Sequence, residues 1–225
     1  ATSVVILSIL IAVIASYSAL TMNGRAQRIG FFHRNLWLMF ASIAMGFGIW
    51  SMHFVGMSAF SLPVHMTYNV TLTVISIVPA MVASFIAFYL SNLPKRGLWV
   101  YILAGVSMGA GISTMHYMGM YAMKMDISYS YNYIIFIVSI GISVAISMLA
   151  VYIFSNLQLY MKNRWIQLST ALIMGLAVSS MHYTGMSAVT FYVPSDFQVH
   201  ALAHDMGNVG GLVIIVTVGM ALLLG

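Results

Sequence analysis

The sequence contains no cysteine and very few charged residues. It has 8 lysines and arginines and 3 acidic residues in 225 positions, so charged residues make up only 5%. The lack of cysteine excludes disulfides and thiolate metal sites. The lack of charge excludes an ordinary water-facing surface. Although the net charge is +5, there is no exposed cationic face of the kind that nucleic-acid binding needs, so we expect no nucleic-acid partner.

Hydrophobic residues make up 62% of the chain, and long apolar runs recur along its whole length. A helical run of about 20 residues spans a hydrocarbon core of roughly 30 Å, so the lipid bilayer is the expected solvent. We predict an all-α membrane protein of about seven transmembrane helices, at residues 2–22, 36–60, 70–91, 98–122, 133–155, 166–190 and 208–225. Because the last run stops at Gly225 within apolar sequence, we expect the natural chain to continue.

The cations are concentrated in alternate loops. Seven of the eight lie in the loops at 23–35, 92–97 and 156–165, namely Arg25, Arg28, Arg34, Lys95, Arg96, Lys162 and Arg164. The opposite loops contain Lys124, Asp126, Asp196 and Asp205. The positive-inside rule therefore predicts an extracytoplasmic amino terminus and a cytoplasmic carboxyl terminus.

One motif occurs three times, centred on His53, His116 and His182. Relative to each histidine, methionine recurs at −8, −1 and +4, glycine at −7 and +3, a hydroxyl residue at −2, an aromatic residue at +1 and alanine at +6. The histidines are 63 and 66 residues apart, which indicates a repeating pair of helices. The repeats are residues 1–66, 67–129 and 130–195, followed by the final helix at 208–225.

Each repeat crosses the membrane twice, so the sequence predicts three parallel repeats with a pseudo-threefold axis along the membrane normal. The three histidines lie 16 to 18 residues beyond the predicted inner end of their helices, about 25 Å up the bilayer at roughly 1.5 Å per residue. Because polar groups in bilayers usually face the bundle interior, we expect the imidazoles to converge in one layer near the outer face.

Imidazole and thioether groups without carboxylate or thiolate favour a soft cation, with Cu(I) preferred over zinc or iron. Residues four apart share a helix face, so the +4 methionines are stronger ligand candidates than the −1 methionines. The candidate metal ligands are His53, His116, His182, Met57, Met120, Met186, Met52, Met115 and Met181. The −2 hydroxyls and +1 aromatics are candidates for supporting the imidazoles. The alternative interpretation is structural, with hydrogen-bonded histidines and methionines that only fill the core.

The blocks Met52-His53-Phe54-Val55, Met115-His116-Tyr117-Met118 and Met181-His182-Tyr183-Thr184 resemble the motif of the MHYT domain, a bacterial membrane sensor domain. The resemblance covers about residues 1–190. It implies copper bound through motif Met and His residues, and sensing of oxygen, carbon monoxide or nitric oxide. It also implies a cytoplasmic output, commonly GGDEF and EAL modules that make or degrade cyclic di-GMP. The present sequence contains no such module, so we expect this segment itself not to be an enzyme.

Two other functions remain open at this point: a copper carrier or channel, and a haem protein in the bilayer that uses two histidines as axial ligands. His200 and His204, four residues apart beside Asp205, are candidates for a second exposed metal site, and His65 for a similar role. We interpret His33 as part of a headgroup-facing basic loop. The sequence does not decide whether the domain forms a homodimer, or which metal or signal it recognises.

Overall fold

The computed structural model describes residues 2–26, 30–62, 64, 66–157 and 163–195. This part of the chain is almost entirely helical, with elements α1 (Thr2–Ala26), α2 (Phe31–Ser58), α3 (Val70–Ile75), α4 (Ile77–Ser91), α5 (Leu98–Tyr121), α6 (Tyr133–Asn156) and α7 (Arg164–Ala188). The predicted helix at 208–225, together with His65, His200 and His204, lies outside the described residues.

Five of the predicted membrane spans are confirmed by length and composition: α1, α2, the α3–α4 pair, α5 and α6. The helix α7 has the required length of 25 residues, but its sequence is more polar. It buries Gln167, Thr170 and His182 among other helices, as expected for polar groups in a bundle interior. The all-helical membrane fold is therefore confirmed, whereas the described residues contain five helices, not seven, that are long and apolar enough to span a membrane.

The predicted span at 70–91 is interrupted at Ser76, between α3 and α4. Pro79 has no amide hydrogen to donate to the carbonyl of Ile75, four residues earlier, and this breaks the helical bonding at that turn. In addition, Trp50 of α2 donates its indole N–H to the carbonyl of Thr73 at 2.9 Å. The interruption thus has a cause within the sequence. The predicted span at 36–60 differs in another way, because α2 already begins at Phe31.

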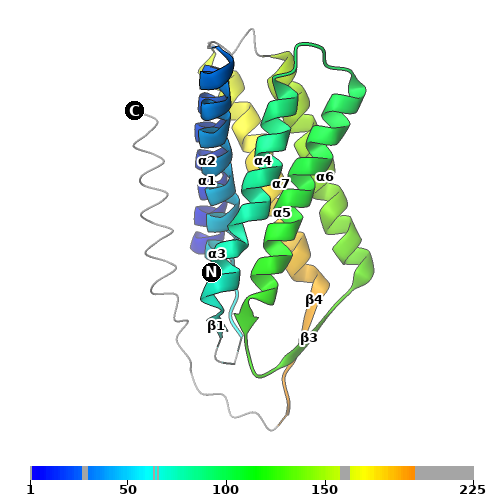
Figure 1. Cartoon of the computed structure of the whole chain (residues 1–225). Helices are drawn as coiled ribbons and strands as arrows, with labels where there is room; N and C mark the ends of the chain where they lie inside the picture. Colours follow the sequence, from blue (N-terminus) through cyan, green and yellow to red (C-terminus); the bar gives the residue numbers. More distant parts are fainter. Residues whose placement is uncertain (1, 27–29, 63, 65, 158–162, 196–225) are drawn as a thin grey trace.

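The long helices run side by side in one bundle (Figure 1). Their contacts close a ring in which plain helices alternate with motif helices. Around the ring, α1 packs against α2 and α7, α4 against α2 and α5, and α6 against α5 and α7. The motif helices α2, α5 and α7 also contact one another in the middle. At −7 in the motif, Gly46, Gly109 and Gly175 lie so close to Met81, Val144 and Val13 that an added methyl group would overlap them. Glycine at −7 therefore permits close packing of each motif helix on a plain helix.

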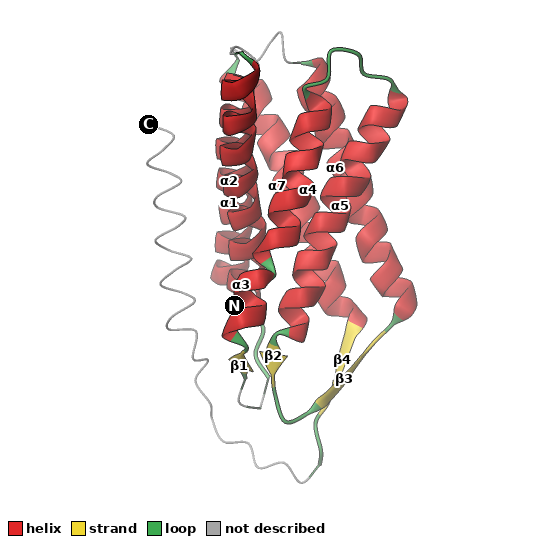
Figure 2. Cartoon of the chain, viewed as in Figure 1, coloured by secondary structure: helices red, strands yellow, loops and turns green. Residues whose placement is uncertain are grey.

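Four short strands, which the sequence analysis missed, link the helices at one end of the bundle (Figure 2). Strand β1 (Thr67–Tyr68) pairs with β2 (Met123–Lys124), and β3 (Ser128–Tyr131) pairs with β4 (Val189–Tyr192), both antiparallel. Two of the three motif alanines at +6 take part, since Asn69 N–H donates to the Ala122 carbonyl and Asn132 N–H to the Ala188 carbonyl. We call this end of the molecule the cap end.

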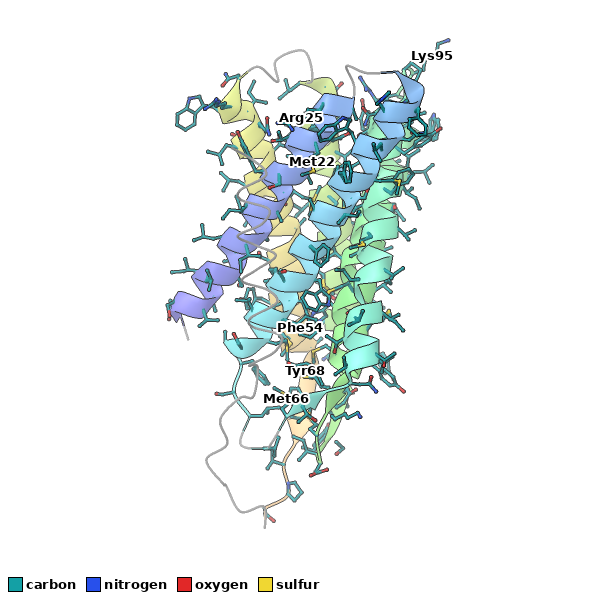
Figure 3. The ribbon with its side chains drawn as sticks, turned by 60° about the vertical axis from the view of Figure 1, so that its left-hand side comes forward. Met22, Arg25, Phe54, Met66, Tyr68 and Lys95 are labelled. Atoms are coloured by element: carbon teal, nitrogen blue, oxygen red, sulfur yellow. The ribbon has the colours of Figure 1, made fainter. Side chains whose placement is uncertain are left out.

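Apart from Lys124, the described cations gather at the opposite end, which we call the basic end. Arg25 lies in the last turn of α1, and Arg164 is the first residue of α7. Lys95 and Arg96 lie between α4 and α5. Figure 3 shows Arg25 and Lys95 at this end and Met66 and Tyr68 at the other. Lys124 and Asp126 lie at the cap end, next to β2. The alternation of charge along the sequence is therefore a separation of charge between the two ends.

Candidate metal centre

The three motif histidines meet in the middle of the bundle, each from a different helix. The Nδ1 atom of His53 on α2 lies 3.0 Å from Nδ1 of His116 on α5 and 3.2 Å from Nδ1 of His182 on α7. The third separation, between His116 and His182, is also 3.2 Å. All three residues are 2% exposed. The predicted convergence of the imidazoles in one buried layer is confirmed.

Each imidazole ring is seated against the +3 glycine of the next motif helix. An added Cβ at Gly119 would lie 2.5 Å from Nε2 of His53, one at Gly185 would lie 2.7 Å from Nε2 of His116, and one at Gly56 would lie 2.6 Å from Nε2 of His182. Each seat therefore has room only for hydrogen at Cα. The +3 glycines therefore hold the rings with Nε2 against the neighbouring helix and Nδ1 directed inward.

The residue at +1 packs edge-on against its own histidine, with ring centroids 4.7 to 4.8 Å apart. Tyr117 shares a 2.8 Å hydrogen bond with Ser139 of α6, and Tyr183 shares one of 2.7 Å with Ser8 of α1. Phe54 has no hydroxyl and packs instead on Trp50 and Tyr68. Supporting contacts were expected from the +1 aromatics, but the serine partners were missed, although Ser76 and Ser139 are 63 residues apart, like His53 and His116.

The hydroxyl residues at −2 do not support the imidazoles as expected. Thr114 is exposed, Ser180 donates to the carbonyl of Leu176 at 2.5 Å, and the Ser51 hydroxyl has no partner within the described part of the chain. Within the same residues, the three Nε2 atoms also have no hydrogen-bond partner. Position −2 is rotated by about 200° from the histidine on an ideal helix, so its side chain cannot reach the ring.

A cavity of about 10 Å³ adjoins the histidines on the side facing the basic end. It is lined by Ile49, Met52, His53, Ile112, Met115, His116, Val178, Met181 and His182. The −1 methionines, which the sequence analysis ranked below the +4 methionines, are thus next to the imidazoles. The +4 methionines are absent from this lining. They lie one turn further along, about 6 Å toward the cap end, where Met57 and Met120 are buried and Met186 is half-buried.

The donor set suits a metal ion. Nitrogen ligands about 2.0–2.1 Å from a metal are roughly 3.3–3.6 Å apart in tetrahedral or trigonal geometry. The observed 3.0–3.2 Å separations therefore need only a small outward movement of each ring. Among the described residues, these three histidines are the one group of His, Cys, Asp or Glu side chains with this mutual proximity. His33, by contrast, lies exposed near the start of α2 beside Phe32.

Comparison with known families agrees with this triplicate site. A family model described as "MHYT: Bacterial signalling protein N terminal repeat" matches residues 46–104, 109–165 and 175–224. The chain belongs to the MHYT family. Each match begins at the −7 glycine of a motif. The three family repeats therefore have the same spacing as the three histidines. The description of the family names a repeat at the amino terminus of bacterial signalling proteins.

Three curated proteins that resemble this MHYT chain are themselves signalling proteins or enzymes of cyclic di-GMP. It is 38% identical to the bifunctional diguanylate cyclase/cyclic di-GMP phosphodiesterase MucR of Pseudomonas aeruginosa, over 95% of this chain and 31% of MucR. It is 34% identical to the cyclic di-GMP phosphodiesterase NbdA of the same organism, over 86% of this chain and 25% of NbdA. It is 35% identical to the signaling protein YkoW of Bacillus subtilis, over 85% of this chain and 24% of YkoW.

The MHYT chain therefore spans less than a third of each of these relatives. No solved structure matches it.

Proposed function

We propose that this chain is a membrane sensor domain that binds one metal ion through Nδ1 of His53, His116 and His182. The supporting observation is the approach of three buried Nδ1 atoms to within 3.0–3.2 Å of one another. A neutral imidazole has one N–H and one lone pair, so three such nitrogens cannot satisfy one another by hydrogen bonds. A cation among them accepts all three lone pairs.

Cu(I) is the ion that we propose. The cavity beside the imidazoles is lined by the thioethers of Met52, Met115 and Met181, and soft thioether ligands favour Cu(I). Zinc sites commonly use Cys or carboxylate together with His, and non-haem iron uses two His and one carboxylate. The chain has no cysteine and no acidic residue on any motif helix. Copper bound here would have nitrogen and sulfur neighbours only.

We propose that the metal itself, rather than a diatomic gas, is the signal. The cavity of about 10 Å³ is at the lower limit for a single water molecule, which leaves no room for O2, CO or NO beside a bound ion. A gas would therefore have to enlarge the site by moving the motif helices. Binding of the ion needs only a small movement of the rings.

A copper carrier is less well supported, because the cavity is bounded toward the basic end by Ile49, Ile112 and Val178, which offer no ligands. Further toward the basic end, Met45 and Met108 each accept a hydrogen bond from a serine at 3.7 Å. This arrangement suits helix packing. Haem is also less well supported. Its two axial ligands lie on opposite faces of a porphyrin, whereas these imidazoles touch one another and leave no space for a macrocycle.

We further propose that metal binding controls cyclic di-GMP turnover by an output module on the cytoplasmic side. MucR and NbdA are named for diguanylate cyclase or cyclic di-GMP phosphodiesterase activity, and the chain covers only part of each. For the metal to act as a switch, it must bind one of two helix packings more tightly than the other. The predicted helix at 208–225 would carry the change to the output module.

The charge separation supports an orientation in the bacterial inner membrane with the basic end in the cytoplasm. The amino terminus is then outside, and the histidines lie nearer the outer face. The alternating contacts of the helix ring support three parallel repeats about an axis along the membrane normal. In the repeats 1–66, 67–129 and 130–195 that we propose, each motif helix follows its plain helix. The matched family segments 46–104, 109–165 and 175–224 begin at the motif instead and continue into the sequence after it.

Metal content of the purified protein tests the proposal. Mass spectrometry should find about one copper per chain after anaerobic loading, and none in a variant with His53, His116 and His182 all changed to Ala. The exposed His33→Ala variant is the control and should keep its copper. If wild type and the triple variant bind the same amount of copper, the histidines are not the binding site. If folded wild type binds no Cu(I), the histidine cluster is purely structural.

A further inference from the structure

A groove of about 480 Å³ lies between α1 and α7, apart from the histidine site. It is lined by Val13, Ile14 and Tyr17 of α1 and by Arg164, Trp165 and Leu168 of α7. Five of these side chains are aliphatic or aromatic, and the sixth, Arg164, is a cation. The volume is within the range of about 300–1,000 Å³ that is typical of small-molecule sites. Apolar walls beside a single cation suit a ligand that is itself part apolar and part anionic.

The groove extends from the basic end over about half of the membrane thickness. Arg164 is the first residue of α7. Val13 is level with Gly175, because an added Cβ at Gly175 would lie 2.6 Å from its side chain. Gly175 is 11 residues beyond Arg164, a rise of about 16 Å along the helix. One leaflet of the hydrocarbon core is about 15 Å thick, so the groove matches the depth of a lipid acyl chain.

The two walls of the groove are held together by contacts between α1 and α7. Gln167, in the same turn as the groove residues of α7, is 9% exposed. Its side-chain amide donates to the carbonyl of Tyr17 and to the hydroxyl of Thr21. Further from the basic end, Val13 packs closely on Gly175. The groove is therefore formed before any ligand arrives, as is usual for binding sites.

Arg164 lies at the end of the groove where lipid headgroups are expected. The neighbouring Trp165 is 75% exposed, and exposed indole rings are typical of the membrane–water interface. A guanidinium group binds phosphate well, because its planar fork donates to two phosphate oxygens at once. The amino-terminal end of α7 adds partial positive charge at the same place. A phosphate at this end of the groove is therefore favoured.

The cation belongs to the third repeat only. The residues 18 positions before the motif histidines are Asn35, Leu98 and Arg164. Leu98 is the first residue of α5, as Arg164 is of α7. Repetition of the helix pair therefore does not account for Arg164, and the groove between α1 and α7 differs in charge from the equivalent positions in the other repeats.

We propose that this groove binds one anionic phospholipid of the leaflet at the basic end. The headgroup phosphate contacts Arg164, and an acyl chain lies along Val13, Ile14 and Leu168. None of the six lining residues is acidic, so nothing in the lining opposes a negative headgroup. A zwitterionic lipid would bring its own ammonium group near the guanidinium, and a free phosphate ion would leave the apolar walls uncovered. Because the lipid contacts both α1 and α7, its binding stabilises the closed ring of helices.

Native mass spectrometry of protein released from nanodiscs tests this site. The discs contain equal amounts of phosphatidylglycerol, which is anionic, and phosphatidylcholine, which is zwitterionic, with identical acyl chains. Arg164→Gln removes the charge at an exposed residue, and Lys95→Gln is its control, because Lys95 is also exposed at the basic end but does not line the groove. Ile14→Trp fills the groove. Leu10→Trp is its control, because Leu10 is 51% exposed on the same helix and outside the lining.

Wild type should retain one phosphatidylglycerol per chain and prefer it to phosphatidylcholine by about fivefold, the effect of one cation near a membrane surface. Arg164→Gln should lose the preference, Ile14→Trp should lose the retained lipid, and both controls should match wild type. Equal retention of the two lipids by wild type, or retention of neither, would overturn the proposal. Full retention in Ile14→Trp would overturn it as well, because the lipid would then lie outside the groove. None of these outcomes depends on metal, so the histidine site is tested separately.

Discussion

The Nε2 atom of His53 rests against the α-carbon of Gly119, so closely that a methyl group there would lie 2.5 Å from the nitrogen. The same relationship joins His116 to Gly185 and His182 to Gly56. The position of each imidazole is therefore fixed by a helix other than its own. Glycine at +3 is part of the site, although it contributes no ligand atom.

Gly119→Ala should displace the His53 ring and weaken metal binding at least about tenfold, the scale seen when groups that orient a ligand are lost. Overpacking of this kind also costs roughly 1–3 kcal/mol of stability. Gly141→Ala on α6 is the control, because an added Cβ there has no atom within 4 Å. Copper titration and thermal unfolding measure both effects. Normal copper affinity in Gly119→Ala would mean that the glycine does not position the ring.

The hydrogen bond between Tyr117 and Ser139 should stabilise the contact of α5 with α6. Tyr117→Phe, Ser139→Ala and the double variant form a thermodynamic cycle, and we expect a coupling energy of about 0.6 kcal/mol, typical of polar pairs in membrane proteins. Reversible unfolding in mixed detergent provides the measurement. A coupling energy of zero would show that the two hydroxyls do not interact in the folded protein.

The stability of the cap end should fall above pH 10. Burial, followed by the neighbouring Tyr129 and Tyr117, raises the pKa of Tyr131 above its ordinary value of 10.0. The unfolded chain then loses this proton at lower pH than the folded chain, so the contribution of Tyr131 is complete below pH 10 and is lost as the pH rises further. Tyr131→Phe should reduce the alkaline loss of stability. Tyr133→Phe, at an exposed residue, is the control and should leave the pH profile unchanged.

The absence of cysteine makes the orientation directly testable. In intact cells, a membrane-impermeant maleimide should label Lys124→Cys at the cap end and not Lys95→Cys at the basic end. After permeabilisation both should react. The reverse pattern would place the basic end outside and would contradict the proposed cytoplasmic output.

The sequence was sufficient to predict the histidine layer, because spacings of 63 and 66 residues fix depth and helix periodicity fixes direction. It was not sufficient to separate the two groups of methionines. Met57 does share a face with His53, but one turn of rise puts its sulfur on the far side of the ring. Met52, about 100° away on its own helix, reaches the cavity because three helices surround it.

The paired strands could not be predicted for a different reason. Segments of two to four residues carry no periodic pattern, and β1 and β2 exist because Asn69 meets the carbonyl of Ala122 on a neighbouring helix. Their positions depend on how the helices pack, which sequence patterns do not specify. The interruption at Ser76 was within reach of sequence reasoning, since Pro79 forbids a bond to Ile75.

That interruption makes the bundle mechanically unequal around its axis. The histidines themselves are nearly equivalent, and a symmetric site by itself favours no direction of movement. The segment from Val70 to Ser91 lacks one helical backbone hydrogen bond, at Pro79. The indole of Trp50, on the helix that carries His53, donates a hydrogen bond to this segment. A helix bends more easily at such a point than where its hydrogen bonding is continuous. Movement of the histidines would therefore bend the segment from Val70 to Ser91 more than the other plain helices.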